Sequence, residues 1–170
     1  AEIFRRQRRF ADAEGEFEKA IQLAPNSPDA YVALAQQDIE MRQFDKARAV
    51  LLRLVAVQPG SAQAQNLLGR VAIEGEQWDD AITRLRRAVE LDSDMDTAWM
   101  ALGFVYETRQ MPEEALKVYR QALQANPDNM AFVERLGDVL VRLGRFKEAQ
   151  QEVEALAESS PRDPRLWIKL

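Results

Sequence analysis

Acid–base or metal chemistry in this chain would have to come from carboxylates, because its 170 residues include no histidine and no cysteine. A Ser-His-Asp triad, a histidine metal site and a thiolate nucleophile are therefore excluded. The serines are Ser27, Ser61, Ser93, Ser159 and Ser160. All of them fall at joints between helical segments, where we expect serine to cap helices. No G-x-x-x-x-G-K phosphate loop occurs. We therefore expect neither an enzyme nor a resident cofactor.

The acidic residues with a metal-like spacing are Asp92, Asp94 and Asp96. They match the start of a calcium loop, which also needs a glycine after the third acidic position and a glutamate at its end. Thr97 and Gly103 occupy those two places. The run lies between two helical segments, so helix capping and compensation of the helix dipole explain it. We expect no metal site here.

Four arginines near the start of the chain, Arg5, Arg6, Arg8 and Arg9, form the tightest basic cluster. Such a cluster can steer an acidic partner, RNA or a lipid headgroup. We favour a solvated turn whose charges meet nearby glutamates, because no interleaved aromatic platform accompanies it. The net charge of −5 also argues against nucleic acid as the main partner.

The elements that must position all these residues follow a period of 34. One column is Pro25, Pro59, Ser93, Pro127 and Pro161; a second is Ala13, Ala47, Ala81, Ala115 and Ala149; a third is Ala1, Ala35, Gly69, Gly103 and Gly137. A fixed interval of this size over the whole chain predicts stacked helical hairpins. The small residues let neighbouring helices approach closely, and large residues such as Tyr31 and Trp99 fill the space between units.

Each period contains two amphipathic helices. Between residues 28 and 61, for example, apolar residues recur at spacings of three and four. A joint at Met41–Gln43 follows, and a second helix from Phe44 ends before Pro59. We divide the chain into a partial repeat at 1–27, repeats at 28–61, 62–95, 96–129 and 130–163, and the start of a further repeat at 164–170.

This pattern resembles the tetratricopeptide repeat. Residues 96–129, which contain the sequence TAWMALGFVYETRQMPEEALKVYRQALQANPDN, are close to a consensus copy, and the resemblance covers essentially the whole chain. The glycine usual at the hairpin joint is clear only at Gly144, and Gly75 is displaced by one position. Arg42 and Gln110 occupy the joint elsewhere, so we expect the hairpin turns to differ in detail.

The resemblance implies an all-α fold: a right-handed superhelical solenoid of antiparallel helix pairs. Its first helices would line a concave groove that holds a peptide or helix of a partner protein, without catalysis. The groove residues it implies are Val32, Gln36, Ile39, Asn66, Arg70, Ile73, Met100, Phe104, Glu107, Glu134, Asp138 and Arg142. Glu40, Gln63, Thr108 and Val141 lie on the same helix faces.

Two groove positions are unusual, because Met100 and Phe104 are apolar where family members often carry polar residues. They either contact a hydrophobic side chain of a partner or pack against their own neighbours. Some family members grip an acidic C-terminal peptide with a clamp of basic residues and asparagines. Met100 and Phe104 stand where that clamp needs a basic residue and an asparagine, so we do not expect it.

Two other functions stay open at this point. The array could be a structural or self-associating segment of a larger assembly, such as a bacterial envelope or secretion complex, with Trp167 and Leu170 exposed at a repeat end. It could also be the regulatory arm of an enzyme. Both chain ends interrupt a repeat, so we expect a longer parent protein. No apolar run approaches 18 residues, and the composition is compatible with the cytoplasm or the periplasm.

Overall fold

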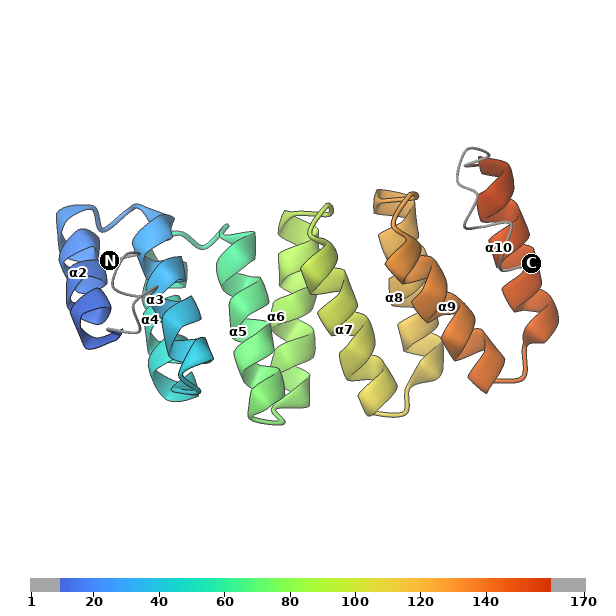
Figure 1. The fold of residues 1–170 in the computed structure, drawn as a ribbon, viewed down its shortest axis with the longest axis horizontal. Helices are drawn as coiled ribbons and strands as arrows, with labels where there is room; N and C mark the ends of the chain where they lie inside the picture. Colours follow the sequence, from blue (N-terminus) through green and yellow to red (C-terminus); the bar gives the residue numbers. More distant parts are fainter. Residues whose placement is uncertain (1–9, 160–170) are drawn as a thin grey trace. The chain divides into compact units, whose positions relative to one another are not determined.

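The computed structural model describes residues 10–159, and every regular element in that range is an α-helix. The chain divides into two compact units, Ala1–Asp92 and Ser93–Leu170. Figure 1 shows the helices of each unit as successive antiparallel rods joined by short turns. The arginine cluster at residues 5–9 and the expected further repeat at 164–170, with Trp167 and Leu170, lie outside the described residues.

The first unit is built from five described helices. They are α2 (Phe10–Leu23), α3 (Pro28–Glu40), α4 (Phe44–Val57), α5 (Ala62–Glu74) and α6 (Trp78–Leu91). Each helix packs against the next one along the chain, and α3 also contacts α5. Pro28 lies in the first turn of α3, where a missing backbone N–H costs no hydrogen bond.

The second unit is built from four described helices that pack in sequence. They are α7 (Asp96–Thr108), α8 (Pro112–Ala125), α9 (Met130–Arg142) and α10 (Phe146–Ser159). Helices α3, α5, α7 and α9 begin 34 residues apart, and so do α4, α6, α8 and α10. The predicted all-α architecture of stacked hairpins is therefore confirmed.

Small residues allow close helix contacts inside both units. Ala13, Ala47, Ala81 and Ala115 are completely buried. A Cβ atom added at Gly69 would lie 2.5 Å from Leu85, and one added at Gly103 would lie 2.4 Å from the ring of Tyr119. A larger residue at either glycine would displace its neighbour, which explains the small residues of the third column at these two positions.

Aromatic side chains tie two of the first helices to the turns that precede them. The hydroxyl of Tyr31 donates a hydrogen bond to the carbonyl oxygen of Pro25 at 3.0 Å. The indole Nε1–H of Trp99 donates to the carbonyl oxygen of Ser93 at 2.8 Å. Both bonds span six residues, and Tyr31 and Trp99 occupy equivalent positions of the repeat. The equivalent turn is therefore held by the same kind of bond in both units.

The hairpin turns are alike, and the expectation that they differ is wrong. Arg42, Glu76, Gln110 and Gly144 all have positive φ, between 54° and 71°. In each of these four turns, which are those of the described residues, the next backbone N–H donates to the carbonyl oxygen five residues earlier, for example from Met111 to Tyr106 at 2.9 Å. This arrangement is the Schellman motif, which usually places glycine at the left-handed residue. Three of the four turns adopt it without glycine.

Serine caps fewer helices than the sequence suggests. The Ser61 hydroxyl accepts a hydrogen bond from the backbone N–H of Ala64 at 3.2 Å, as a capping residue does. Ser27 precedes α3 but makes no such side-chain bond. Ser93 bonds to Asp94 instead, and Met95 precedes α7. Ser160 lies outside the described residues, as does the side chain of Ser159.

Candidate partner-binding surface

The groove positions predicted in the first unit lie on α3 and α5. Arg70 is exposed, while Gln36, Ile39 and Ile73 are half-buried. Val32 and Asn66 are buried inside the unit. Of the six groove positions predicted in the first unit, only these other four therefore offer groups at the surface.

The groove positions predicted in the second unit lie on α7 and α9. Phe104, Glu134, Asp138 and Arg142 are exposed, and Met100 and Glu107 are half-buried. The structure thus places these candidate residues on two neighbouring first helices, with mixed chemistry at the surface.

Glu107 joins three helices of the second unit. Its Oε1 accepts a hydrogen bond of 2.6 Å from the hydroxyl of Tyr119 on α8. Its Oε2 forms an ion pair with Arg142 on α9. Two predicted groove residues, one on α7 and one on α9, therefore pair with each other. Charge-assisted bonds of this kind are stronger than neutral ones.

Tyr119 holds the Glu107 carboxylate in place through this hydrogen bond. Its ring packs on Gly103 and is almost completely buried. Burial, together with the hydrogen bond to Glu107, raises the pKa of Tyr119 far above its usual range. The hydroxyl therefore stays protonated and keeps donating its hydrogen bond to Glu107.

Apolar groups remain exposed beside the Glu107–Arg142 pair. Phe104 on α7 and Val141 on α9 each retain 50% of their accessible surface. The Thr108 hydroxyl donates to the carbonyl oxygen of Phe104 at 2.9 Å, so it is occupied within its own helix. Exposed phenylalanine on a helix held in place on both sides is a feature of interaction surfaces.

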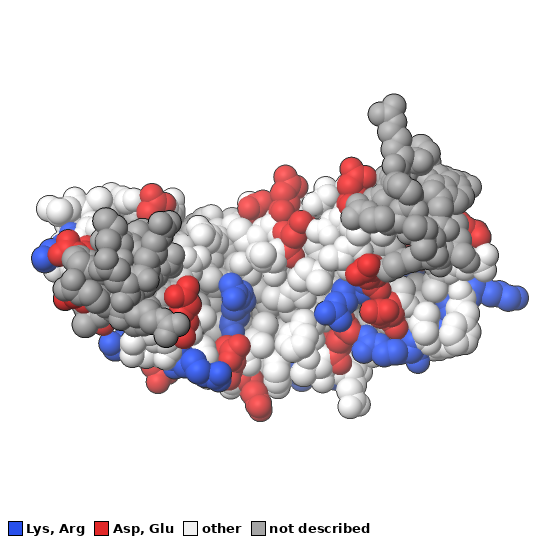
Figure 2. Space-filling model, in the orientation of Figure 1, with Lys and Arg blue, Asp and Glu red and all other residues white. Residues whose placement is uncertain are grey.

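Many charged side chains on the second helices are paired between successive repeats. Lys46 bonds to Glu14 at 3.1 Å, Arg53 to Glu18 at 2.7 Å, and Arg120 to Glu152 at 2.8 Å. Figure 2 shows basic and acidic side chains occurring together on the face drawn, with uncharged surface between them. These pairs bind the protein's own helices together and leave less charge to attract a partner.

The aspartates with metal-like spacing have other roles. Asp96 lies in the first turn of α7, and its carboxylate accepts hydrogen bonds from Asn129 at 2.7 Å and from Asn126 at 3.3 Å. Among residues 10–159, no three carboxylates converge on a point that could hold a metal ion. Over the same residues, no helix is both long and apolar enough to cross a membrane.

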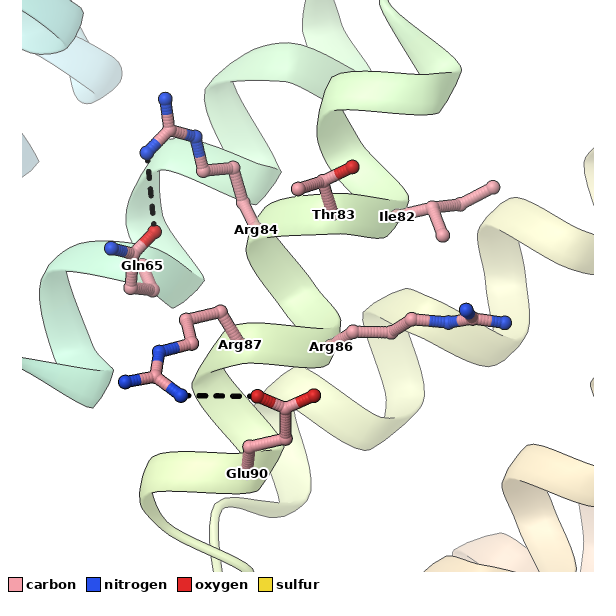
Figure 3. A pocket seen from close by; sticks show the side chains of 7 residues that line it. All are labelled: Gln65, Ile82, Thr83, Arg84, Arg86, Arg87 and Glu90. Carbon is pink, nitrogen blue, oxygen red and sulfur yellow. Dashed lines mark hydrogen bonds and ion pairs between the residues drawn. The ribbon is translucent and has the colours of Figure 1, made fainter.

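A hollow that the sequence analysis missed lies beside α5 and α6 in the first unit. This open hollow has a volume of about 430 Å³, and its lining residues are Gln65, Ile82, Thr83, Arg84, Arg86, Arg87 and Glu90 (Figure 3). One signal could have found it, because Gln65 stands one period after Tyr31 and one before Trp99. The next period has Val133 at this position, so Gln65 is a polar residue in a column that is otherwise aromatic or apolar.

Several solved structures share this fold, and three of them illustrate the likeness. MamA is 21% identical, with a TM-score of 0.77 over 96% of this chain and 90% of its own. PilF of Pseudomonas aeruginosa is 21% identical, with a TM-score of 0.74 over 96% and 74%. YrrB, described as having an unusual peptide-binding site, is 21% identical, with a TM-score of 0.68 over 85% and 75%. No curated protein sequence matches the chain.

Sequence models of the tetratricopeptide repeat match almost the entire chain. One matches residues 4–71 and 108–170, and another matches residues 69–130. These matches agree with the 34-residue spacing of the helices and with the fold of the compared structures. The chain belongs to the tetratricopeptide repeat family, whose members are typically protein-interaction scaffolds.

Proposed function

We propose that the protein is a non-catalytic scaffold that binds a segment of a partner protein on the exposed faces of its first helices. The observation that carries this proposal is the half-exposed ring of Phe104 on α7. A buried glycine precedes it, and the Tyr119–Glu107–Arg142 network anchors its helix. An exposed aromatic side chain on a well-packed helix is the kind of anchor that dominates binding energy.

The surroundings of Phe104 favour a peptide with an apolar side chain. Val141 adds a second exposed apolar group, and Met100 is half-buried on the same helix as Phe104. Exposed Asp138 and Glu134 on α9 supply polar atoms around this apolar centre. An apolar centre with a polar surround is the usual anatomy of a protein interface.

The first unit offers a more polar surface for the same role. Arg70 is exposed on α5, and Gln36 on α3 is half-buried, as are Ile39 and Ile73. We propose that this face by itself binds a partner through hydrogen bonds and charge, whereas the face of the second unit binds through the apolar ring of Phe104. YrrB, which shares the fold, is described as having a peptide-binding site, so a peptide is a reasonable class of ligand to test first.

The helices need little reordering to bind. Close glycine contacts fix α5 and α7, and each first helix ends in the same hairpin turn, so binding would cost little conformational entropy. A small number of contacts can then give useful affinity.

The test compares two Phe→Ala variants against a peptide selected from a displayed random library on the wild-type protein. We expect Phe104→Ala to weaken binding at least about tenfold, which corresponds to about 1.4 kcal/mol. Phe146→Ala is the matched control, because Phe146 is 64% exposed but lies on the second helix α10. Calorimetric titration gives both affinities, and circular dichroism verifies that helix content is unchanged.

Equal affinities for Phe104→Ala and the wild type would exclude the α7 face as the binding surface. A photoreactive residue at position 104 gives a second readout, because it should crosslink to the bound peptide. The same residue at exposed Gln121 on α8 should not.

A further inference from the structure

The hollow beside α5 and α6 has a surplus of positive charge. Three arginines and one glutamate contribute to its lining, in a chain whose net charge is −5. Figure 3 shows the side chains of Arg84 and Arg87 extending from α6 on the side where Gln65 lies, whereas Ile82 and Arg86 extend to the other side. Gln65, Arg84 and Arg87 therefore form one group, which we call the Arg84–Arg87 pocket.

Arg84 is held in a fixed orientation by its neighbours. Its Nε donates to the Oδ1 of Asp80 at 3.2 Å, and its Nη1 lies 3.4 Å from the Oε1 of Gln65. Asp80 also accepts a bond of 3.0 Å from Arg48 on α4, so its single negative charge is shared by two arginines. The guanidinium of Arg84 is thus oriented but only partly neutralised.

Gln65 is a polar side chain buried where the other repeats place aromatic or apolar residues. Only 6% of its surface is accessible, yet it lines the pocket. Its Oε1 accepts a hydrogen bond from Arg84, and the N–H groups of the same amide can only donate. A buried amide facing two guanidinium groups favours a ligand that accepts hydrogen bonds and carries negative charge.

Arg87 is the second arginine of the pocket, and its guanidinium can contact a ligand. Its Nη1 bonds to Glu90 at 3.1 Å, and both side chains are mostly exposed. Exposed pairs of this kind contribute little to stability, so the guanidinium can turn to a ligand at small cost.

From these contacts we infer that the Arg84–Arg87 pocket binds a carboxylate. The two ligand oxygens would accept hydrogen bonds from Arg84 and Arg87, with the Gln65 amide as an additional donor. Guanidinium groups match the planar geometry of a carboxylate, and they already pair with Asp80 and Glu90 here. Glu90 stays close by, and its charge repels a phosphate, which concentrates up to two negative charges on one group, more than a carboxylate group, which carries one. The inference does not depend on the role of Phe104.

The test is a titration of the whole chain followed by NMR of side-chain N–H groups. Three probes are added separately: a blocked peptide of three glutamates, citrate and inorganic phosphate. We expect the Gln65 amide and the Arg84 and Arg87 Nε–H signals to shift with the peptide or citrate, with a Kd of about 1 mM or tighter. A response to the peptide alone assigns the site to an acidic protein segment, and a response to citrate alone assigns it to small carboxylates.

Variants distinguish specific binding in this pocket from general attraction between a negative ligand and exposed arginines. Arg87→Gln should weaken carboxylate binding about tenfold, because one of the two guanidinium groups is lost. Gln65→Leu should weaken it as well and remove the amide signal. Arg135→Gln is the control, because Arg135 is exposed on α9 in the second unit.

Three results would overturn the inference. They are the absence of shifts at these signals with every probe, equal or tighter binding of phosphate, and equal weakening by Arg135→Gln and Arg87→Gln. Circular dichroism of each variant shows whether the fold is intact, and the NMR signals of wild-type protein test the site without any substitution.

Discussion

At the scale of single residues, Asp38 on α3 is the least expected side chain of the core. It is only 1% exposed, and one carboxylate oxygen has no hydrogen-bond partner among the described residues. The equivalent positions one, two and three periods later are Ala72, Tyr106 and Leu140, which are apolar or aromatic. Burial, with a smaller contribution from nearby Glu14, raises the pKa of Asp38 to about 6.

This carboxylate should make the stability of the first unit depend on pH. The pKa of Asp38 is about 6 in the folded protein against 3.8 for the ordinary side chain, so the folded state holds the proton more tightly. Its contribution to the free energy of unfolding is therefore lost as the pH rises from about 4 to about 6. Above that range the loss amounts to at most about 3 kcal/mol.

Asp38→Asn tests this pH dependence, because asparagine keeps the shape and removes the charge. We expect the variant to be more stable than the wild type by about 1–3 kcal/mol above pH ~7, and the difference to shrink towards pH ~4. Urea unfolding followed by circular dichroism at several pH values gives the difference. Asp138→Asn, at an exposed site on α9, should change stability by less than about 0.5 kcal/mol. A constant difference for Asp38→Asn at all pH values would contradict the prediction.

At the scale of elements, the hairpin turn imposes its conformation on whatever residue stands there. Gln110 has φ of 56°, and the two backbone bonds that follow the Schellman pattern close its turn. Arg42 has the same conformation, and its guanidinium lies 5.6 Å from the Phe44 ring centre and 3.9 Å from Glu74. Side-chain contacts thus offset part of the backbone cost at Arg42.

Glycine at position 110 should stabilise the second unit. A non-glycine residue in the left-handed region costs about 1–2 kcal/mol, and part of this is offset because glycine is more flexible in the unfolded chain. We therefore expect Gln110→Gly to raise the free energy of unfolding by about 0.5–1 kcal/mol. Gly144→Ala, in the equivalent turn, should lower it by a similar amount. Thermal unfolding measures both changes, and a destabilising Gln110→Gly would show that the glutamine side chain has a compensating role.

At the scale of the whole molecule, each unit contains its own network of packing. In the first unit, Phe17 and Ile21 of α2 pack in one cluster with residues of α3, α4 and α5. In the second unit, Phe132 and Leu136 of α9 are buried in the same way as Leu102 of α7. Repeat proteins gain stability mainly from contacts between neighbouring repeats.

Residues 1–92 should therefore fold without the second unit. Trp78 is the single tryptophan of this segment, so its fluorescence reports on the hairpin of α5 and α6. We expect helical circular dichroism and one cooperative transition in which the fluorescence and the ellipticity change together. Separate transitions, or a spectrum without helix, would show that the first unit depends on contacts outside itself.

The sequence by itself determined the architecture, since its signals are local and repeated. Proline stops helices and small residues permit close packing, so the columns through Pro59, Ala47 and Gly103 set the order and length of the helices. The repeat columns also indicate the family, and the composition excludes histidine and thiolate chemistry. Which residues contact a partner stays a prediction.

Only the tertiary structure decided how the surface is used, because that depends on which side chains meet across helices. It paired Glu107 with Arg142, buried Val32 and Asn66, and gave the four hairpins within residues 10–159 the same turn. It also brought Gln65 of α5 to Arg84 of α6, which are 19 residues apart. A period fixes where helices start, whereas the few ångströms between facing side chains are set by packing.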